Sequence, residues 1–201
     1  MDDADRKMST QSLGLFSEKR AAQVAAYFLH KGNGRMPLLK LMKLMYLAER
    51  LSFKKFGEPL VGDKLVSMDH GPVLSRTYNY INGMVLSVEG GWESWISDRE
   101  GHDVALRDPS LIRSPEQDLL ELSESDLEVL GEVWQEFGHW DRWKLRDYTH
   151  DHCPEWEDPH GSSTPIDYER LFKALNFSVE ESEVLVARLR AQEAVNAAFA
   201  A

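Results

Sequence analysis

Apolar residues recur every three or four positions along several stretches of the chain, which is the spacing of an amphipathic helix. The first stretch begins at Ser17, a helix-capping residue, and ends at the glycines of KGNGR. Another runs from Ser123, which with Asp126 has the pattern of a capping box, to Gly138. The same spacing predicts further helices over residues 139–149, 166–176 and 179–197.

The most apolar of these stretches, residues 37–56, predicts a helix at the centre of a bundle. Pro37 suits its first turn, and Gly57 suits its end. Its basic side chains fall in one narrow stripe, and apolar side chains cover most of the remaining circumference. The stripe consists of Lys40, Lys43, Arg50 and Lys54.

Glu49 lies roughly opposite this stripe, among Met42, Met45 and Phe56. A carboxylate buried among such side chains must be paired, hydrogen-bonded or protonated. We expect it to anchor a neighbouring segment through a backbone N–H, an arginine or a tyrosine. The alternative is a catalytic role, because buried carboxylates with shifted pKa values also occur in active sites.

Two segments have the pattern of short β structure. Residues 58–69 contain an apolar pair, a Gly-Asp turn and an alternating run, which predicts a small hairpin or an extended strap. Residues 92–98 and 104–106 flank the turn REGHD and predict a second hairpin. Residues 151–165 are rich in proline, glycine, serine and acidic residues and should form a loop.

The predicted fold is therefore mainly α: a single compact helical domain with one or two small β-hairpins inserted. We expect this domain over residues 16–198, with its core motifs within residues 17–156. A flexible tail over residues 1–15 would precede it, and a frayed C-terminus at residues 199–201 would follow it.

The segment HGPV, from His70 to Val73, has three interpretations: a phosphate cradle, a catalytic histidine or the start of a helix. Pro72 removes one N–H donor and no lysine follows as in a P-loop, which argues against the cradle. A catalytic His70 would need a positioned partner, and the side chain of Asp69 diverges from it in an extended segment. We therefore expect a helix over residues 73–83, opened by Gly71 and Pro72.

Histidines, acidic residues and one cysteine gather between His139 and His160. His150, His152 and Cys153 are candidate zinc ligands, since zinc favours imidazole and thiolate. Their spacing matches neither HExxH nor paired CxxC motifs. A metal-dependent hydrolase is the alternative, while the simpler expectation is that His150 and Trp156 close the loop against the core, without a cofactor.

Composition narrows the possible partners. The 201 residues carry a net charge of −11, which argues against unaided nucleic-acid binding because phosphate contacts need a cationic surface. That charge suits a basic protein partner, or it serves solubility alone. The single cysteine favours a cytoplasmic protein. The chain also lacks an apolar run of the ~20 residues that a helix needs to span a membrane.

Two further features concern partners. The pairs Trp92 with Trp95 and Trp140 with Trp143 are candidate interface anchors, or they cover the core instead. The alanine-rich end, closing in Ala200 and Ala201, resembles the ends that bacterial AAA+ unfoldases grip, and a ragged helix end is the alternative.

Several of these motifs together resemble one family. LMKLMYLAE, which contains Lys43, Tyr46 and Glu49, precedes HGPV in the sequence, and a Thr-His pair and Pro154-x-Trp156 follow. This combination resembles the Panacea domain, the SocA-like antitoxin family often found in phage and prophage genomes. The resemblance runs from about residue 17 to residue 156.

The resemblance implies a non-enzymatic role and a set of structural residues. A member would bind and neutralise a protein toxin encoded by a neighbouring gene, and members pair with unrelated toxins. Delivery of the toxin to a Clp-type protease is a further role that the resemblance implies. HGPV, with Gly71, Pro72 and Val73, would be a strap held against the central helix, with Glu49 as a candidate anchor.

Overall fold

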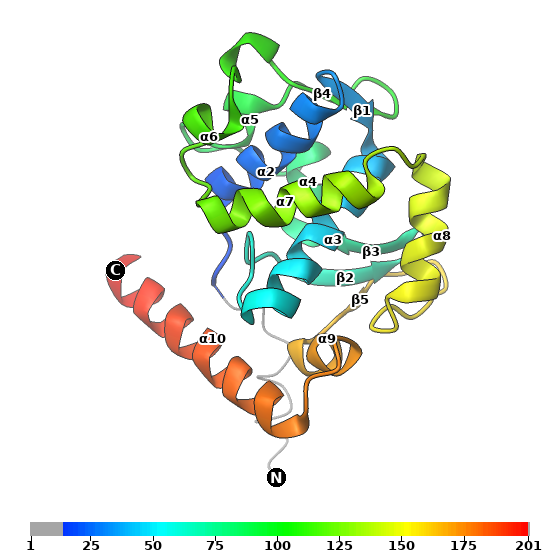
Figure 1. The fold of residues 1–201 in the computed structure, drawn as a ribbon, viewed down its shortest axis with the longest axis vertical. Coiled ribbons are helices and arrows are strands. Elements are labelled where there is room, and N and C mark those ends of the chain that lie inside the picture. The colour runs from blue at the N-terminus through cyan, green and yellow to red at the C-terminus, as the bar shows by residue number, and fades with distance from the viewer. Residues whose placement is uncertain (1–13, 201) are drawn as a thin grey trace.

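The computed structural model describes residues 14–200 and confirms a mainly α fold with two small antiparallel sheets (Figure 1). The described helices are α2 (Glu18–Lys31), α3 (Leu38–Phe56), α4 (Ser75–Ile81), α5 (Trp92–Trp95), α6 (Pro115–Asp118), α7 (Glu124–Phe137), α8 (Arg142–His152), α9 (Tyr168–Ala174) and α10 (Val179–Ala200), with a 3-10 turn, η1, at Pro109–Leu111. The described strands are β1 (Arg35–Pro37), β2 (Leu65–Met68), β3 (Gly71–Leu74), β4 (Asp103–Ala105) and β5 (Thr164–Pro165).

Some of the predicted features lie at or beyond the ends of the described residues. Most of the predicted tail, residues 1–13, and the terminal Ala201 lie outside the described residues, as does the side chain of Ala200. Two residues at the boundary between the predicted tail and the predicted domain, Leu15 and Phe16, pack against the core. Within residues 14–200, no helix combines the length and the apolar character needed to cross a membrane.

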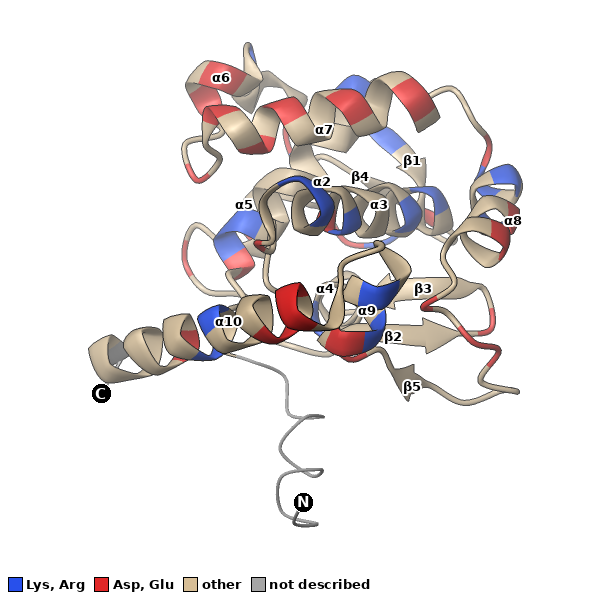
Figure 2. Ribbon diagram, turned by 60° about the horizontal axis from the view of Figure 1, so that its bottom comes forward, with Lys and Arg blue, Asp and Glu red and all other residues tan. Residues whose placement is uncertain are grey.

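Helix α3 lies at the centre of the molecule, as its apolar surface predicts. It contacts α2, α7, α8 and β3, and Figure 2 shows α7 above the α2–α3 pair and the sheet of β2, β3 and β5 below it. Leu41, Leu44 and Met45 are fully buried because these layers cover α3 on several sides. Each such side chain contributes roughly 1.5–3 kcal/mol on burial, so α3 supplies much of the hydrophobic stabilisation.

The helix ends follow the capping residues in the sequence. The Ser17 side chain accepts a hydrogen bond from the backbone N–H of Arg20, and Ser123 and Asp126 form the reciprocal capping box at the start of α7. Helix α3 ends at Gly57, whose φ of 65° lies in the left-handed region that glycine favours. The predicted positions of these helices are confirmed.

The first hairpin lies further along the chain than predicted. Strands β2 and β3 pair antiparallel with Met68 opposite Gly71, so the chain turns at residues 69–70. Gly-Pro-Val is therefore a strand, and the helix expected from residue 73 begins at Ser75. Pro72 is tolerated because β3 is an edge strand in the order β3–β2–β5.

The second predicted hairpin is only partly formed. The chain reverses at the predicted turn, with isolated antiparallel bridges between Glu100 and Asp103 and between Ile96 and Leu106. Residues 92–95, however, form the helical turn α5 in place of a strand, and β4 pairs with β1. The Glu18 carboxylate on α2 accepts hydrogen bonds from the backbone N–H of Trp92 (2.8 Å) and of Val88 (3.2 Å). This contact holds the start of α5 against α2, and no short-range sequence pattern reveals it.

Gly71, the first residue of β3, packs closely against side chains of α3 and α8. Its φ is +94°, which side chains rarely adopt, and a Cβ there would lie 2.7 Å from Lys43 Nζ and 2.8 Å from Thr149 Oγ1. Glycine is thus required at this position for two reasons, backbone conformation and close packing.

Replacing Gly71 by alanine should lower the free energy of unfolding by about 2–4 kcal/mol. The left-handed conformation accounts for roughly 1–2 kcal/mol and the overpacking for the rest. Gly101→Ala is the matched control, because Gly101 has a φ of +63° and no atom within 4 Å of its added Cβ. Urea denaturation measures both variants, and equal losses would contradict the close approach of β3 to Lys43.

Candidate functional site

Lys43 is buried between α3, β3 and α8, although the sequence places it in a polar stripe. Its side chain is fully enclosed, and Nζ donates a hydrogen bond of 2.7 Å to the Pro72 carbonyl oxygen. Lys43 is buried despite its place in the stripe because β3 and α8 cover this side of α3. Burial lowers the pKa of Lys43 to about 7, because the ammonium loses its hydration; the negative charge of a Cys153 thiolate would oppose that shift.

Tyr46 and Arg50, on the same helix, both bind Glu155. The Glu155 side chain is fully buried and accepts hydrogen bonds of 2.7 Å from Tyr46 Oη and from Arg50 Nε. Burial, and then the nearby Glu155 charge, raise the pKa of Tyr46. The sequence does not single out Glu155, because this residue lies in a segment with the composition of an acidic, solvated loop. The available signal was its position between Pro154 and Trp156, the middle of a motif.

His150 and Trp156 close the loop that follows α8, as expected. Their rings stack with centroids 4.0 Å apart and planes 4° from parallel. Trp156 Nε1 also donates to the Met68 carbonyl oxygen at 3.0 Å, which ties the loop to β2. Burial lowers the pKa of His150, with the Lys43 charge as a further cause, so the neutral ring is favoured. We call Lys43, Tyr46, Arg50, Pro72, His150, Glu155 and Trp156 the buried polar cluster.

The candidate zinc ligands are not brought together. The Cys153 thiol is buried, and burial raises its pKa to about 12, which disfavours a thiolate ligand. The His152 ring stacks on Tyr148 instead. Across residues 14–200, no group of three or more histidine, cysteine or acidic residues has an arrangement that could hold a metal ion.

Glu49 anchors a neighbouring segment through backbone N–H groups, as expected, but not the segment expected. Its carboxylate accepts hydrogen bonds of 2.8–3.0 Å from the N–H groups of Leu60, Val61 and Gly62. Burial raises its pKa to about 7, while these three donors favour the ionised form. HGPV is held by Lys43 instead, so Glu49 and Lys43 position two different segments.

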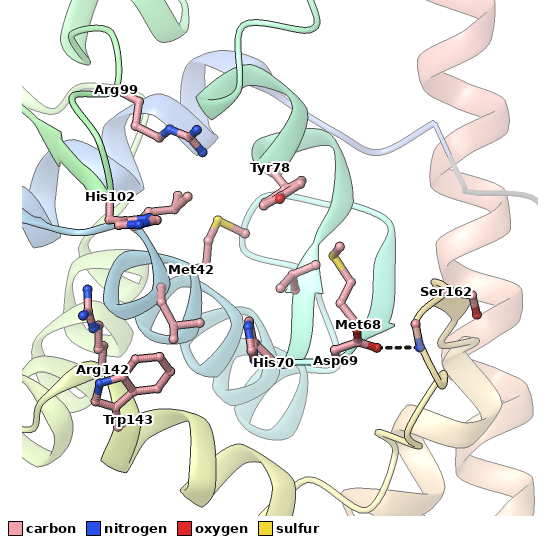
Figure 3. A pocket seen from close by; sticks show the side chains of 14 residues that line it. Met42, Met68, Asp69, His70, Tyr78, Arg99, His102, Arg142, Trp143 and Ser162 are labelled. Atoms are coloured by element: carbon pink, nitrogen blue, oxygen red, sulfur yellow. Dashed lines mark hydrogen bonds between the residues drawn. The ribbon is translucent and has the colours of Figure 1, made fainter.

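A pocket of about 520 Å³ opens beside the cluster, between the starts of α3 and α8 (Figure 3). We call it the α3–α8 pocket. Apolar side chains of α3, β2, β3 and α4 form its floor: Leu38, Leu39, Met42, Met68, Val73 and Tyr78. Its polar lining includes His70 in the β2–β3 turn, Arg99 and His102 before β4, and Arg142 at the start of α8.

The four tryptophans proposed as anchors differ in exposure. Trp92 is buried, with 3% of its surface exposed, and stacks on Tyr80. Trp95 and Trp140 pack against the core with part of each ring exposed. Trp143 is 46% exposed and lies at the edge of the α3–α8 pocket. Of these rings, Trp143 is the most available to a partner.

The family model described as "Antitoxin SocA-like, Panacea domain" matches residues 41–157, more than half of the chain. The chain belongs to this family. No curated protein and no solved structure shows significant similarity to it. The matched range runs from the first turns of α3 to just beyond Trp156, so the Panacea domain of this chain contains the whole buried polar cluster.

Lys43→Met should remove a pH dependence from the stability of this Panacea domain. The folded protein releases the Lys43 proton near pH 7, whereas the unfolded chain keeps it until near pH 10.5. Wild-type stability should therefore rise relative to Lys43→Met by about 1.4 kcal/mol per pH unit between pH 7 and 8.5. Urea denaturation across that range measures the difference.

The control for this prediction is Lys54→Met, at an exposed position of the same helix. It should follow the wild-type pH dependence. A Lys43→Met variant that shows the same pH dependence as wild type would mean that Lys43 is charged in the folded protein at these pH values.

Glu155→Gln should lower the free energy of unfolding by about 3 kcal/mol. The change keeps the shape of the side chain but removes the charge that balances the Arg50 guanidinium. Glu157→Gln is the matched control, since the Glu157 side chain is 75% exposed in its pair with Arg170 and should matter by less than about 1 kcal/mol. If the two variants shift the denaturation midpoint equally, the buried Glu155–Arg50 pair does not contribute more to stability than the exposed Glu157–Arg170 pair.

Proposed function

We propose that this protein is an antitoxin that neutralises a cognate protein toxin by binding it directly, without catalysis of its own. The observation that supports this best is the family match over residues 41–157, a range that contains the whole buried polar cluster. Lys43 holds Pro72, Glu49 holds residues 60–62, and Glu155 holds Arg50. These groups serve the scaffold, which leaves partner recognition to the surface.

The exposed side of α8 is the surface we propose for the partner. Trp143 is flanked by the Arg142 and Arg146 guanidinium groups, whose central carbons lie 4.9 Å and 5.0 Å from the ring centroid. Tryptophan and arginine are the residue types most enriched among interface hot spots. The chain's net charge of −11 disfavours a nucleic-acid partner, and the two arginines at this surface favour an acidic patch on the toxin. The pair would meet in the cytoplasm, where a lone cysteine stays reduced.

Delivery of the toxin to a Clp-type protease is a second proposal. Its support is the far end of α10, which carries the exposed apolar residues Val195 and Phe199 and extends away from the core toward Ala200 (Figure 1). An apolar, exposed helix end is a segment that an unfoldase could grip. Replacing Ala200 and Ala201 by aspartate should then lengthen the lifetime of this protein in cells. If the half-life is unchanged, neutralisation by direct binding is the one form of the proposal that remains.

A growth assay tests the antitoxin proposal. The neighbouring reading frame is expressed in a bacterial host alone and then together with this protein, followed by co-purification on a sizing column. Growth arrest that this protein relieves, with a stable complex, is the expected result. Relief with loss of the toxin over time, and no complex, would favour delivery to a protease, and the absence of toxicity and of a complex would overturn both forms.

Trp143→Ala tests the proposed surface within the same assay. Loss of a hot-spot tryptophan costs about 2 kcal/mol or more, so the toxin should bind roughly 30-fold more weakly. Leu120→Ala is the control, because Leu120 is 81% exposed and lies between α6 and α7, away from α8. If both variants bind the toxin as the wild type does, the partner surface lies elsewhere.

A further inference from the structure

The α3–α8 pocket has the size and the floor of a ligand site. Its volume of about 520 Å³ falls within the range of roughly 300–1,000 Å³ typical of small-molecule pockets. Met42 and Val73 at its base are almost fully buried, and Met68 and Tyr78 extend the apolar surface. Methionine side chains adapt to ligands of different shape, so this floor would accept a flat or branched apolar group.

Arginines outnumber acidic residues in the lining of the pocket, although the chain as a whole is acidic. Arg99, His102 and Arg142 lie on one side of the pocket (Figure 3). Neither arginine is in an ion pair among the described residues, although Arg20, Arg35, Arg50, Arg113, Arg146, Arg170 and Arg188 each have a carboxylate partner.

The contacts that these arginines do make leave them able to bind an anion. Arg99 Nη1 donates to Asn82 Oδ1 at 2.7 Å, and Arg142 stacks on Trp143. A guanidinium has five N–H donors, so most of the donors of Arg99 remain available. The acidic residue of the pocket, Asp69, is on the opposite side and accepts the Gly161 N–H at 2.8 Å.

We propose that the α3–α8 pocket binds an organic anion with an apolar body, of the aromatic carboxylate class. The acidic group would lie between Arg99, His102 and Arg142, and the body would lie on Met42, Met68 and Tyr78. A chain of net charge −11 repels anions over most of its surface, so two arginines without carboxylate partners above an apolar floor mark the place where one can bind. The anion is either a free small molecule or an acidic, apolar group on a protein partner, because both present the same chemistry.

Two fluorescent probes with the same rings test this inference on the full chain. 8-Anilinonaphthalene-1-sulfonate carries one negative charge, and N-phenyl-1-naphthylamine is its neutral counterpart. The anionic probe should bind at least 10-fold more tightly than the neutral one. Methionine methyl resonances, labelled with ¹³C, should shift at Met42 and Met68 when it binds.

The double variant Arg99→Gln/Arg142→Gln should lose the preference for the anionic probe and keep the binding of the neutral one, which also shows that the variant is folded. The control Arg107→Gln/Arg190→Gln removes two exposed arginines elsewhere and should keep the preference. Equal binding of the two probes by the wild type, equal losses in the two double variants, or shifts confined to other methionines would each overturn the inference.

A further arm distinguishes the two sources of the anion. If the co-purified toxin displaces the bound anionic probe, the acidic group belongs to the partner; if probe and toxin bind together, the site takes a free molecule. The probe experiments need no toxin, so their outcome stands whether or not the antitoxin proposal holds.

Discussion

The segments that surround α3 keep their positions because α3 buries polar side chains that bind them. Lys43 holds the Pro72 carbonyl of β3, Glu49 holds the backbone N–H groups of residues 60–62, and Arg50 with Tyr46 holds Glu155 after α8. A buried polar group without a partner costs roughly 1–3 kcal/mol, so the loss of any one of these contacts would destabilise the fold. The central helix therefore provides both the hydrophobic core and fixed attachment points.

Directional contacts matter here because hydrophobic packing alone does not define where a loop turns. Apolar burial is non-directional and roughly proportional to area, so a β-hairpin could shift along α3 at little cost. The Lys43–Pro72 hydrogen bond and the close approach at Gly71 exclude such shifts. They fix the β2–β3 turn, and this turn contributes His70 and Asp69 to the α3–α8 pocket. The geometry of the exposed pocket thus depends on the buried contacts behind it.

The features that could be predicted from the sequence are those with local causes. The capping residues act within a turn or two of their own positions, so the sequence predicts the helices that begin after Ser17 and Ser123 and the helix that ends before Gly57. Glu155 could not be placed, because its partner Tyr46 is 109 residues away in the sequence. Pro72 fits an edge strand as well as a first helical turn, so the sequence alone could not separate the two. A helical projection counts Lys43 as polar and says nothing of what covers it.

The residues of the buried polar cluster contact one another inside the Panacea domain, which separates them from the groups at the surface. The groups at the surface, Trp143, Arg99 and Arg142, make no hydrogen bond to the buried polar cluster among the described contacts. Surface substitutions of this kind usually change stability by less than about 0.5 kcal/mol, whereas a change at Lys43 or Glu155 disturbs buried contacts. Substitution around the α3–α8 pocket can therefore change the chemistry of its lining while the scaffold that positions the pocket stays the same.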